Sequence, residues 1–268
     1  MPLNLSTTLE FKITNTSPII RIPLVKGELL GHGSASLEVD WGDGSDVTSH
    51  EFSDNTVVHM LFHKYSTIPG NNIVTVKIYG GWGFSGKFGF CKSDERPAGN
   101  TMDKLYKVKS QENLWIHGQG DFKDCVELVS LNKVWGKFVK DGNQKFELIE
   151  TFAGCTNLES GVGNWKLDGC TKLEGVFKDT QSYQEWIRGW NISEVTSMKS
   201  LFEGSTYDDK SICGWTMTSV EDTSYMFKNS SFSQWINTWF PANNNSLSIQ
   251  NISGMFEGAA FNSCLLYT

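Results

Sequence analysis

Three aspartates near the N-terminus are the first residues whose type and spacing could perform chemistry. Asp40, Asp43 and Asp46 fall within a stretch of seven residues. Carboxylates at this spacing can bind calcium, but calcium takes about six to eight oxygen ligands and the remaining ones cannot be identified. We favour the alternative, a tight turn held by Asx hydrogen bonds, in which Gly42 and Gly44 provide positive φ.

The other reactive side chains do not form a recognisable site. On a strand His59 and His63 would lie about 13 Å apart, too far to share one ion, so we interpret both as structural. The cysteines include no CxxC pair, which favours six reduced thiols over a zinc site: Cys91, Cys125, Cys155, Cys170, Cys213 and Cys264. No P-loop, GxSxG, HExxH or Rossmann motif occurs. We therefore expect a protein that is not an enzyme, with no catalytic residues, cofactor or metal.

The overall composition limits the partners. The net charge of -7 and the pI of about 5.3 disfavour nucleic acid, and no apolar run is long enough to insert into a membrane. The first residues lack the basic and apolar regions of a secretory signal, although such a segment can have been trimmed.

Alternation of apolar and polar residues marks the first 90 residues. It is clearest over residues 9–13, 36–41 and 73–79, and it predicts the strands of an antiparallel sheet. Two segments, Val39-Asp-Trp-Gly-Asp-Gly-Ser45 and His63-Lys-Tyr-Ser-Thr-Ile-Pro-Gly-Asn-Asn-Ile-Val-Thr-Val-Lys-Ile78, resemble the PKD domain, an immunoglobulin-like fold. The resemblance covers about 75 residues. It implies a β-sandwich over residues 1–90 with a turn formed by Asp40, Trp41, Gly42, Asp43 and Gly44.

Two aromatic residue types recur with the same period in the second half of the chain. The phenylalanines are spaced by 25, 25, 25 and 29 residues: Phe152, Phe177, Phe202, Phe227 and Phe256. The tryptophans are spaced by 25, 25 and 24: Trp165, Trp190, Trp215 and Trp239. This period is typical of leucine-rich repeats, which predicts a short α/β solenoid over residues 145–268. Residues 91–144 are then a linker and degenerate capping repeats.

The apolar spacing within each repeat predicts a short helix. In residues 195–202 apolar side chains occur at i, i+3, i+6 and i+7, which is one face of about one to two helical turns. The recurring aromatics are either the core of the stack or a row of sugar-binding platforms, and we favour the core. Positions that vary between repeats are better candidates for a binding surface, such as Asp208, Asp209, Lys210, Asn243 and Asn244.

The repeats resemble a known family. Gly189-Trp-Asn-Ile-Ser-Glu-Val-Thr-Ser-Met-Lys-Ser-Leu-Phe-Glu-Gly204 and Gly254-Met-Phe-Glu-Gly-Ala-Ala-Phe-Asn262 are similar to BspA-type leucine-rich repeats, over about 120 residues. The resemblance implies bacterial surface proteins that attach to host or matrix proteins. It also implies phage structural proteins, in which such repeats accompany PKD-like domains.

These observations favour a multi-domain fold, a PKD-like β-sandwich followed by the α/β solenoid, and a non-enzymatic binding role. We expect a phage virion component such as a capsid decoration, tail or fibre protein, located in the virion. The alternatives are a bacterial cell-surface adhesin and a carbohydrate-active protein with a cryptic site. The expected partners are other virion proteins, further copies of the chain packed against residues 264–268, or a host surface protein or glycan.

The core interpretation of the aromatics predicts a loss of stability on truncation. Replacing Trp190 or Phe202 by Ala should lower the free energy of unfolding by about 3–5 kcal/mol, because each change leaves a large cavity. Thermal and denaturant unfolding of the two variants measure this loss. If Trp190→Ala abolished ligand binding at an unchanged melting temperature, the sugar-platform interpretation would replace the core interpretation.

Overall fold

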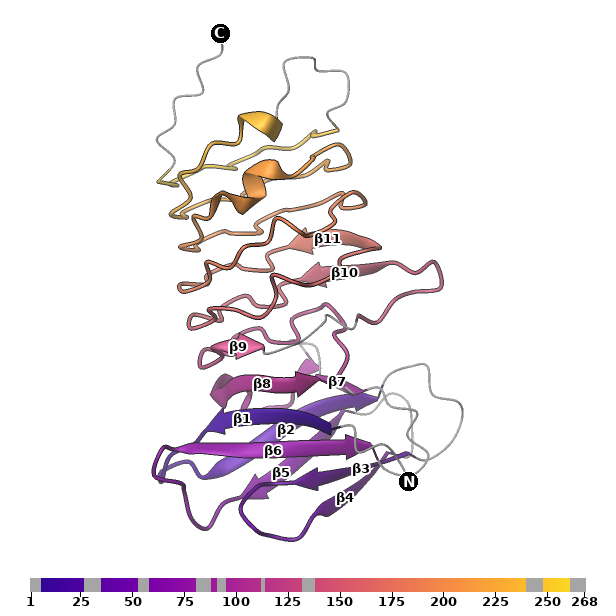
Figure 1. Ribbon diagram of the computed structural model, residues 1–268, viewed down its shortest axis with the longest axis vertical. Coiled ribbons are helices and arrows are strands. Elements are labelled where there is room, and N and C mark those ends of the chain that lie inside the picture. The colour runs from indigo at the N-terminus through magenta and orange to yellow at the C-terminus, as the bar shows by residue number, and fades with distance from the viewer. Residues whose placement is uncertain are drawn as a thin grey trace.

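The structure is an elongated molecule with β-sheets at its N-terminal end and a stack of chain turns beyond them (Figure 1). This computed structural model describes residues 6–26, 35–52, 58–80, 88–90, 95–111, 114–131, 138–239 and 248–260. Several predicted features lie outside the described residues: Cys91, Cys264, the variable positions Asn243 and Asn244, and the contact at residues 264–268.

Two sheets form the N-terminal part, and both follow the predicted alternation of buried and exposed side chains. The six-stranded sheet has the order β4-β3-β6-β1-β8-β9, and the three-stranded sheet has the order β5-β2-β7. The strands are β1 (Ser6–Lys12), β2 (Ile19–Lys26), β3 (Ala35–Asp40), β4 (Thr48–Phe52), β5 (His59–Lys64), β6 (Ile73–Gly80), β7 (Phe88–Phe90), β8 (Leu105–Gln111) and β9 (Ser130–Leu131). A single-turn 3-10 helix, η2 (Met102–Lys104), precedes β8.

The large sheet continues directly into the stack. Strand β8 pairs antiparallel with β1 and parallel with β9, and β9 in turn bridges to the next turn of chain through Ser130 and Ser160. The edge of the sheet is thereby covered by the first turn of the stack, so neither part leaves this edge unpaired. One hydrophobic cluster runs through both parts, from Leu9 to Met255.

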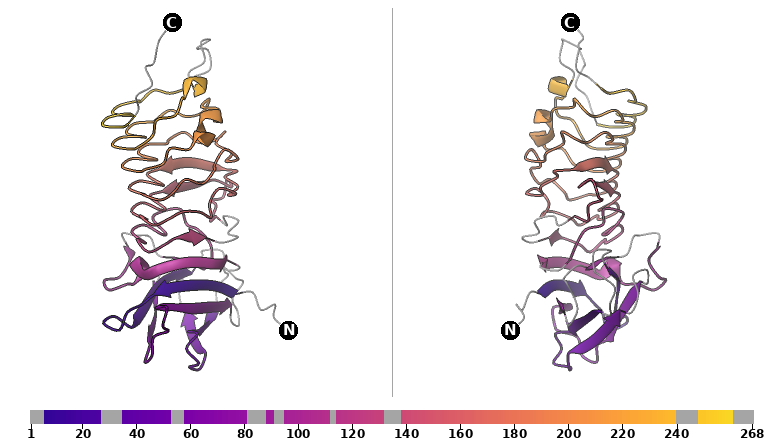
Figure 2. Two further views of the ribbon diagram at one scale, coloured as in Figure 1. Left: turned by 60° about the vertical axis from the view of Figure 1, so that its left-hand side comes forward. Right: turned by 90° about the vertical axis from the view of Figure 1, so that its right-hand side faces the viewer.

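Successive turns of chain, which we call rungs, form a column over residues 114–260 (Figure 2). Each rung is named by its phenylalanine: Phe122, Phe152, Phe177, Phe202, Phe227 and Phe256. The backbone N–H of the phenylalanine in each of the first five rungs donates to a carbonyl of the following rung, at 2.9–3.0 Å. The column therefore keeps one register along its length, and its regular strands are short: β10 (Phe146–Ile149) and β11 (Cys170–Glu174).

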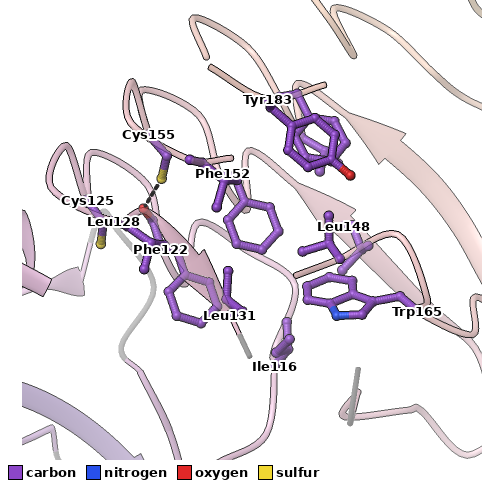
Figure 3. Close-up of a cluster of buried hydrophobic side chains, with 14 of the residues drawn as sticks. Ile116, Phe122, Cys125, Leu128, Leu131, Leu148, Phe152, Cys155, Trp165 and Tyr183 are labelled. Carbon is purple, nitrogen blue, oxygen red and sulfur yellow. Dashed lines mark hydrogen bonds between the residues drawn. The ribbon is translucent and has the colours of Figure 1, made fainter. Parts of the chain in front are cut away.

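The aromatic residues form stacks inside the column. The six rung phenylalanines stack in sequence with ring centroids 5.2–6.0 Å apart, and Phe90 of β7 packs edge-on against the first of them. Figure 3 shows the start of this stack, with Phe122 and Phe152 beside Trp165. Three of the tryptophans also donate their indole N–H to a carbonyl one rung earlier, Trp190 to Val162, Trp215 to Ile187 and Trp239 to Ile212.

The predicted fold class, a PKD-like β-sandwich followed by an α/β solenoid, is wrong. The described residues contain no α-helix; outside the strands they form turns, coil and single-turn 3-10 helices such as η3 (Lys210–Gly214) and η4 (Asn237–Trp239). The three-residue spacing of the apolar residues here reflects consecutive turns. In these turns the Leu201 N–H donates to the Met198 carbonyl and the Ser205 N–H donates to the Phe202 carbonyl. The N-terminal sheets are not a closed sandwich, because the larger one extends through β9 into the repeats.

Two left-handed backbone positions in each rung, one before and one after the phenylalanine, explain why a helix does not form there. The first lies two residues before the phenylalanine, and in the expected helix over residues 195–202 it is Ser200, with a φ of 55°. The second lies two residues after the phenylalanine. It holds, rung by rung, Asp124, Gly154, Asp179, Gly204, Asn229 and Gly258, all with φ between 54° and 73°. Acidic or amide side chains thus alternate with glycine. The reason is steric, because a Cβ on Gly154, Gly204 or Gly258 would overlap the side-chain oxygen of the Asx residue one rung before it.

This alternation predicts a compensating pair of substitutions. Gly204→Ala should destabilise the protein by about 1–2 kcal/mol from the left-handed conformation alone, and by more because the new methyl group overlaps Asp179. Adding Asp179→Gly removes the overlap and should restore part of the loss. Urea unfolding measures both variants, and Gly189→Ala, with open space around its Cβ, is the control. Purely additive effects would contradict this packing argument.

Candidate functional site

The aspartate turn is built as a structural element. Asp40 accepts a hydrogen bond from the Gly42 N–H at 2.8 Å, and Asp43 accepts from the backbone and hydroxyl of Ser45. Gly42 has a φ of 73°, and a Cβ there would overlap the Thr75 carbonyl oxygen. Within the described residues no group of three or more His, Cys, Asp or Glu side chains is arranged to bind a metal.

Trp41 and His63 connect this turn to the sheets. The His63 imidazole lies 2.7 Å from the Asp43 carboxylate and stacks on Trp41 with a centroid distance of 4.9 Å. Trp41 is buried, and its backbone carbonyl oxygen accepts a hydrogen bond from the Tyr65 hydroxyl. Burial would raise the pKa of the Asp43 carboxyl, but hydrogen bonds from Ser45 and His63 outweigh it and lower the pKa to about 2.

The residues predicted as the repeat core lie inside the column. Phe152, Phe177, Phe202, Phe227, Trp165, Trp190, Trp215 and Trp239 are each at most 4% exposed, and Phe256 is partly buried against the same cluster. The thiols are also in the interior, because Cys125, Cys155 and Cys170 are buried and Cys213 is intermediate. Burial raises the pKa of Cys125 and of Cys170 to about 12, so these two thiols stay protonated at neutral pH.

Two other tryptophans, Trp186 and Trp235, lie on the outside of the column. Their exposed fractions are 63% and 67%, the highest among the large exposed apolar residues of the described structure. They line one concave surface, which we call the tryptophan groove, with a volume of about 670 Å³. Its lining residues are Trp186, Arg188, Asp209, Lys210, Ser211, Cys213, Gly214, Gln234 and Trp235.

The repeat register explains why the groove is open between its two tryptophans. In three consecutive rungs the residue before the buried isoleucine is Trp186, Ser211 and Trp235. Ser211 is small and turned inward, where its hydroxyl accepts the Ile187 N–H and bonds the Tyr207 hydroxyl. The middle rung thus forms the floor, and the two indoles belong to the rungs on either side of it.

The floor is formed by the helix η3, the orange single turn in Figure 1. Asp209 caps this helix, since its side chain accepts the Ser211 N–H at 2.7 Å. Gly214 ends the helix, and a Cβ there would lie 3.1 Å from the Arg188 Nε. The guanidinium of Arg188 therefore lies close to the backbone of the next rung at Gly214.

The two basic side chains of the groove lie outside the ion pairs of the described residues. Eight lysines elsewhere in the described chain form ion pairs, among them Lys178 with Glu203 and Lys228 with Glu257. Arg188 and Lys210 form none with the residues that the structure describes. The groove thus holds two cations and one carboxylate, Asp209, in a protein of net charge -7.

The sequence interpretation placed Asp209 and Lys210 among the variable surface positions, and both line the groove. Asp208 belongs to the same variable stretch, but its carboxylate binds Ser233 of the next rung. Trp186 and Trp235 were missed. The available signal is their register, because each lies four residues before a core tryptophan and outside the periodic core positions.

The fold and the groove together define a repeat protein with a solvent-exposed aromatic groove. A family profile described as "Mycoplasma protein of unknown function, DUF285" matches residues 146–266. DUF285 is related to the BspA-type repeats, so the match supports that resemblance for the repeat region, without extending to the PKD-like segment. No curated protein and no solved structure matches the chain. Among the described residues, no helix has the length and apolar character needed to span a membrane.

The aspartate turn predicts a pH-dependent contribution to stability. The folded-state pKa of Asp43 lies below its ordinary value of 3.8, so the ionised form favours the folded protein at neutral pH. This stabilisation should disappear as the pH falls from about 4 to about 2. Asp43→Asn should therefore destabilise the protein at pH 7 and lose that effect at pH 2. Unfolding curves across this range test the prediction, with Asp46→Asn as control. A constant difference at all pH values would contradict it.

Proposed function

We propose that this protein is a non-enzymatic binding protein that captures its partner in the tryptophan groove. The observation that carries the proposal is the exposure of two tryptophans on a column whose four periodic tryptophans are buried. Exposing two large aromatic faces to water without a partner is unfavourable, and tryptophan is enriched where proteins bind ligands and other proteins. Both side chains lie in the part of the chain that matches DUF285.

The form of the site favours binding rather than chemistry. The groove is open and its polar groups are Arg188, Lys210, Asp209 and Gln234. Arginine and lysine recognise anions, and Asp209 is already engaged in capping η3. The lining has one hydroxyl, that of Ser211, and one thiol, that of Cys213. The Ser211 hydroxyl accepts the Ile187 N–H, and burial raises the pKa of the Cys213 thiol, which disfavours its reactive thiolate form.

A bacterial cell surface is the location that we now favour over the virion. The matching family is described by a bacterial genus, Mycoplasma, and its relation to the BspA-type repeats supports a surface-attachment role. The virion stays the alternative. The two locations differ in the genes beside the coding sequence, because capsid or tail genes would indicate a virion and a sorting or secretion signal would indicate a cell surface.

The binding proposal predicts that the groove tryptophans are needed for attachment and not for folding. Wild-type protein and the Trp186→Ala/Trp235→Ala variant are compared by surface plasmon resonance on immobilised mucin, collagen and hyaluronan. We expect the double variant to bind at least about tenfold more weakly, which corresponds to about 1.4 kcal/mol, at an unchanged melting temperature. Phe62→Ala removes another exposed aromatic side chain and is the matched control. Undiminished binding by the double variant would contradict the proposal.

A further inference from the structure

The charged side chains of the tryptophan groove are mostly cationic hydrogen-bond donors, while Gln234 offers both a donor and an acceptor. Arg188 and Lys210 carry only donors, and the one carboxylate, Asp209, already accepts the Ser211 N–H. A ligand rich in acceptors and carrying negative charge complements these groups.

A second observation comes from the preceding rung. There the Glu185 carboxylate accepts the backbone N–H groups of residues 161, 162 and 163 at 2.8–2.9 Å. One rung later Lys210 takes the position of Glu185 and cannot accept a hydrogen bond. The N–H of Ile187 is bonded by Ser211, whereas those of Trp186 and Arg188 donate to no residue that the structure describes. The groove thus offers donors at a position where the neighbouring rung contains a carboxylate.

The two rungs differ in backbone conformation at this point. Gly161 has a φ of 114°, which directs its N–H toward the Glu185 carboxylate, and Trp186 does not adopt a positive φ. The backbone N–H groups of Trp186 and Arg188 are therefore not gathered around one side chain, as the N–H groups of residues 161–163 are around the Glu185 carboxylate. The Arg188 guanidinium, held over Gly214, supplies the charge and the paired N–H groups that complete an anion site.

The two indoles add a requirement for a flat apolar face. They stand two rungs apart. The buried tryptophans of the same three rungs stack at 6.4 and 6.5 Å per step, so a two-rung separation accommodates one further ring. The C–H face of a pyranose ring stacks on indole while its edge carries hydroxyl and carboxyl oxygens. One ring of this kind can stack on the two indoles and place its carboxyl oxygens on the basic side chains of Arg188 and Lys210.

We propose that the tryptophan groove binds acidic glycans, with a carboxylated sugar ring between Trp186 and Trp235 and its carboxylate on Arg188. This inference rests on the proposed binding function and names the ligand class of the same site. Lys210 adds a second positive charge on the floor, so the affinity falls as the salt concentration rises.

Isothermal titration with defined hexasaccharides tests the ligand class. The full chain is titrated with hyaluronan and oligogalacturonate hexasaccharides as carboxylated probes, with cellohexaose as the neutral probe and with a sulfated hexasaccharide. We expect at least one carboxylated probe to bind at least about tenfold more tightly than the neutral probe. Binding of the sulfated probe without either carboxylated probe would overturn the carboxylate assignment, and equal binding of the neutral probe would overturn the acidic class.

The variants separate the roles of the charge and the indoles. Arg188→Gln should lower the affinity for the carboxylated probe about tenfold and leave any weak binding of cellohexaose unchanged. Trp186→Ala and Trp235→Ala should lower the affinity for every probe. Lys64→Gln, an exposed lysine on β5, is the charge control. No response to Arg188→Gln would overturn the inference. If the double tryptophan variant lost binding to mucin or collagen while no hexasaccharide bound, the proposed function would stand and the glycan assignment would fail.

Discussion

The hydrogen bond from each rung phenylalanine N–H to the following rung is the interaction on which the rest of the column depends. It fixes the register at five successive steps, and the phenylalanine rings can stack within 6.0 Å only because their backbones are held in that register. A stack of this kind needs a first partner, since its end exposes unpaired backbone groups. Strand β8 supplies it, because this edge strand of the N-terminal sheet pairs with β9. The sheet is therefore the platform on which the column is assembled.

A fixed register divides the residues of every rung into two classes. Positions directed inward must repeat, which explains the recurring tryptophans with their N–H bonds to the preceding rung. Positions directed outward are free to vary, and there the chain places charge pairs in most rungs. The tryptophan groove occupies such outward positions. Its geometry depends on a single small residue, Ser211, standing between two tryptophans.

The sequence allowed the strands of the N-terminal part, the repeat period and the inward aromatics to be predicted, because alternation and period are local properties of the chain. The helices could not be distinguished from turns, since an apolar spacing of three residues suits both. The decisive information was the left-handed backbone conformation of residues such as Ser200 and Asp179, which the apolar spacing does not reveal. Phe122 was missed for a similar reason, because its 30-residue offset from Phe152 breaks the period.

The groove could not be predicted from the sequence, because it forms only when the rungs stack. Trp186 and Trp235 are 49 residues apart in the sequence, and only the stacking of rungs brings them to one surface. That surface combines two exposed indoles with two cations that form no ion pair. Lys166 and Lys199 also form none with the residues that the structure describes, so the combination distinguishes the surface. Along the column Lys178, Glu203, Lys228 and Glu257 alternate in sign and pair across rungs. If the column only had to be stable, Arg188 and Lys210 could be paired in the same way. Leaving them unpaired gives up a small stabilisation, typically below about 1 kcal/mol for an exposed pair, and keeps both cations available for a ligand.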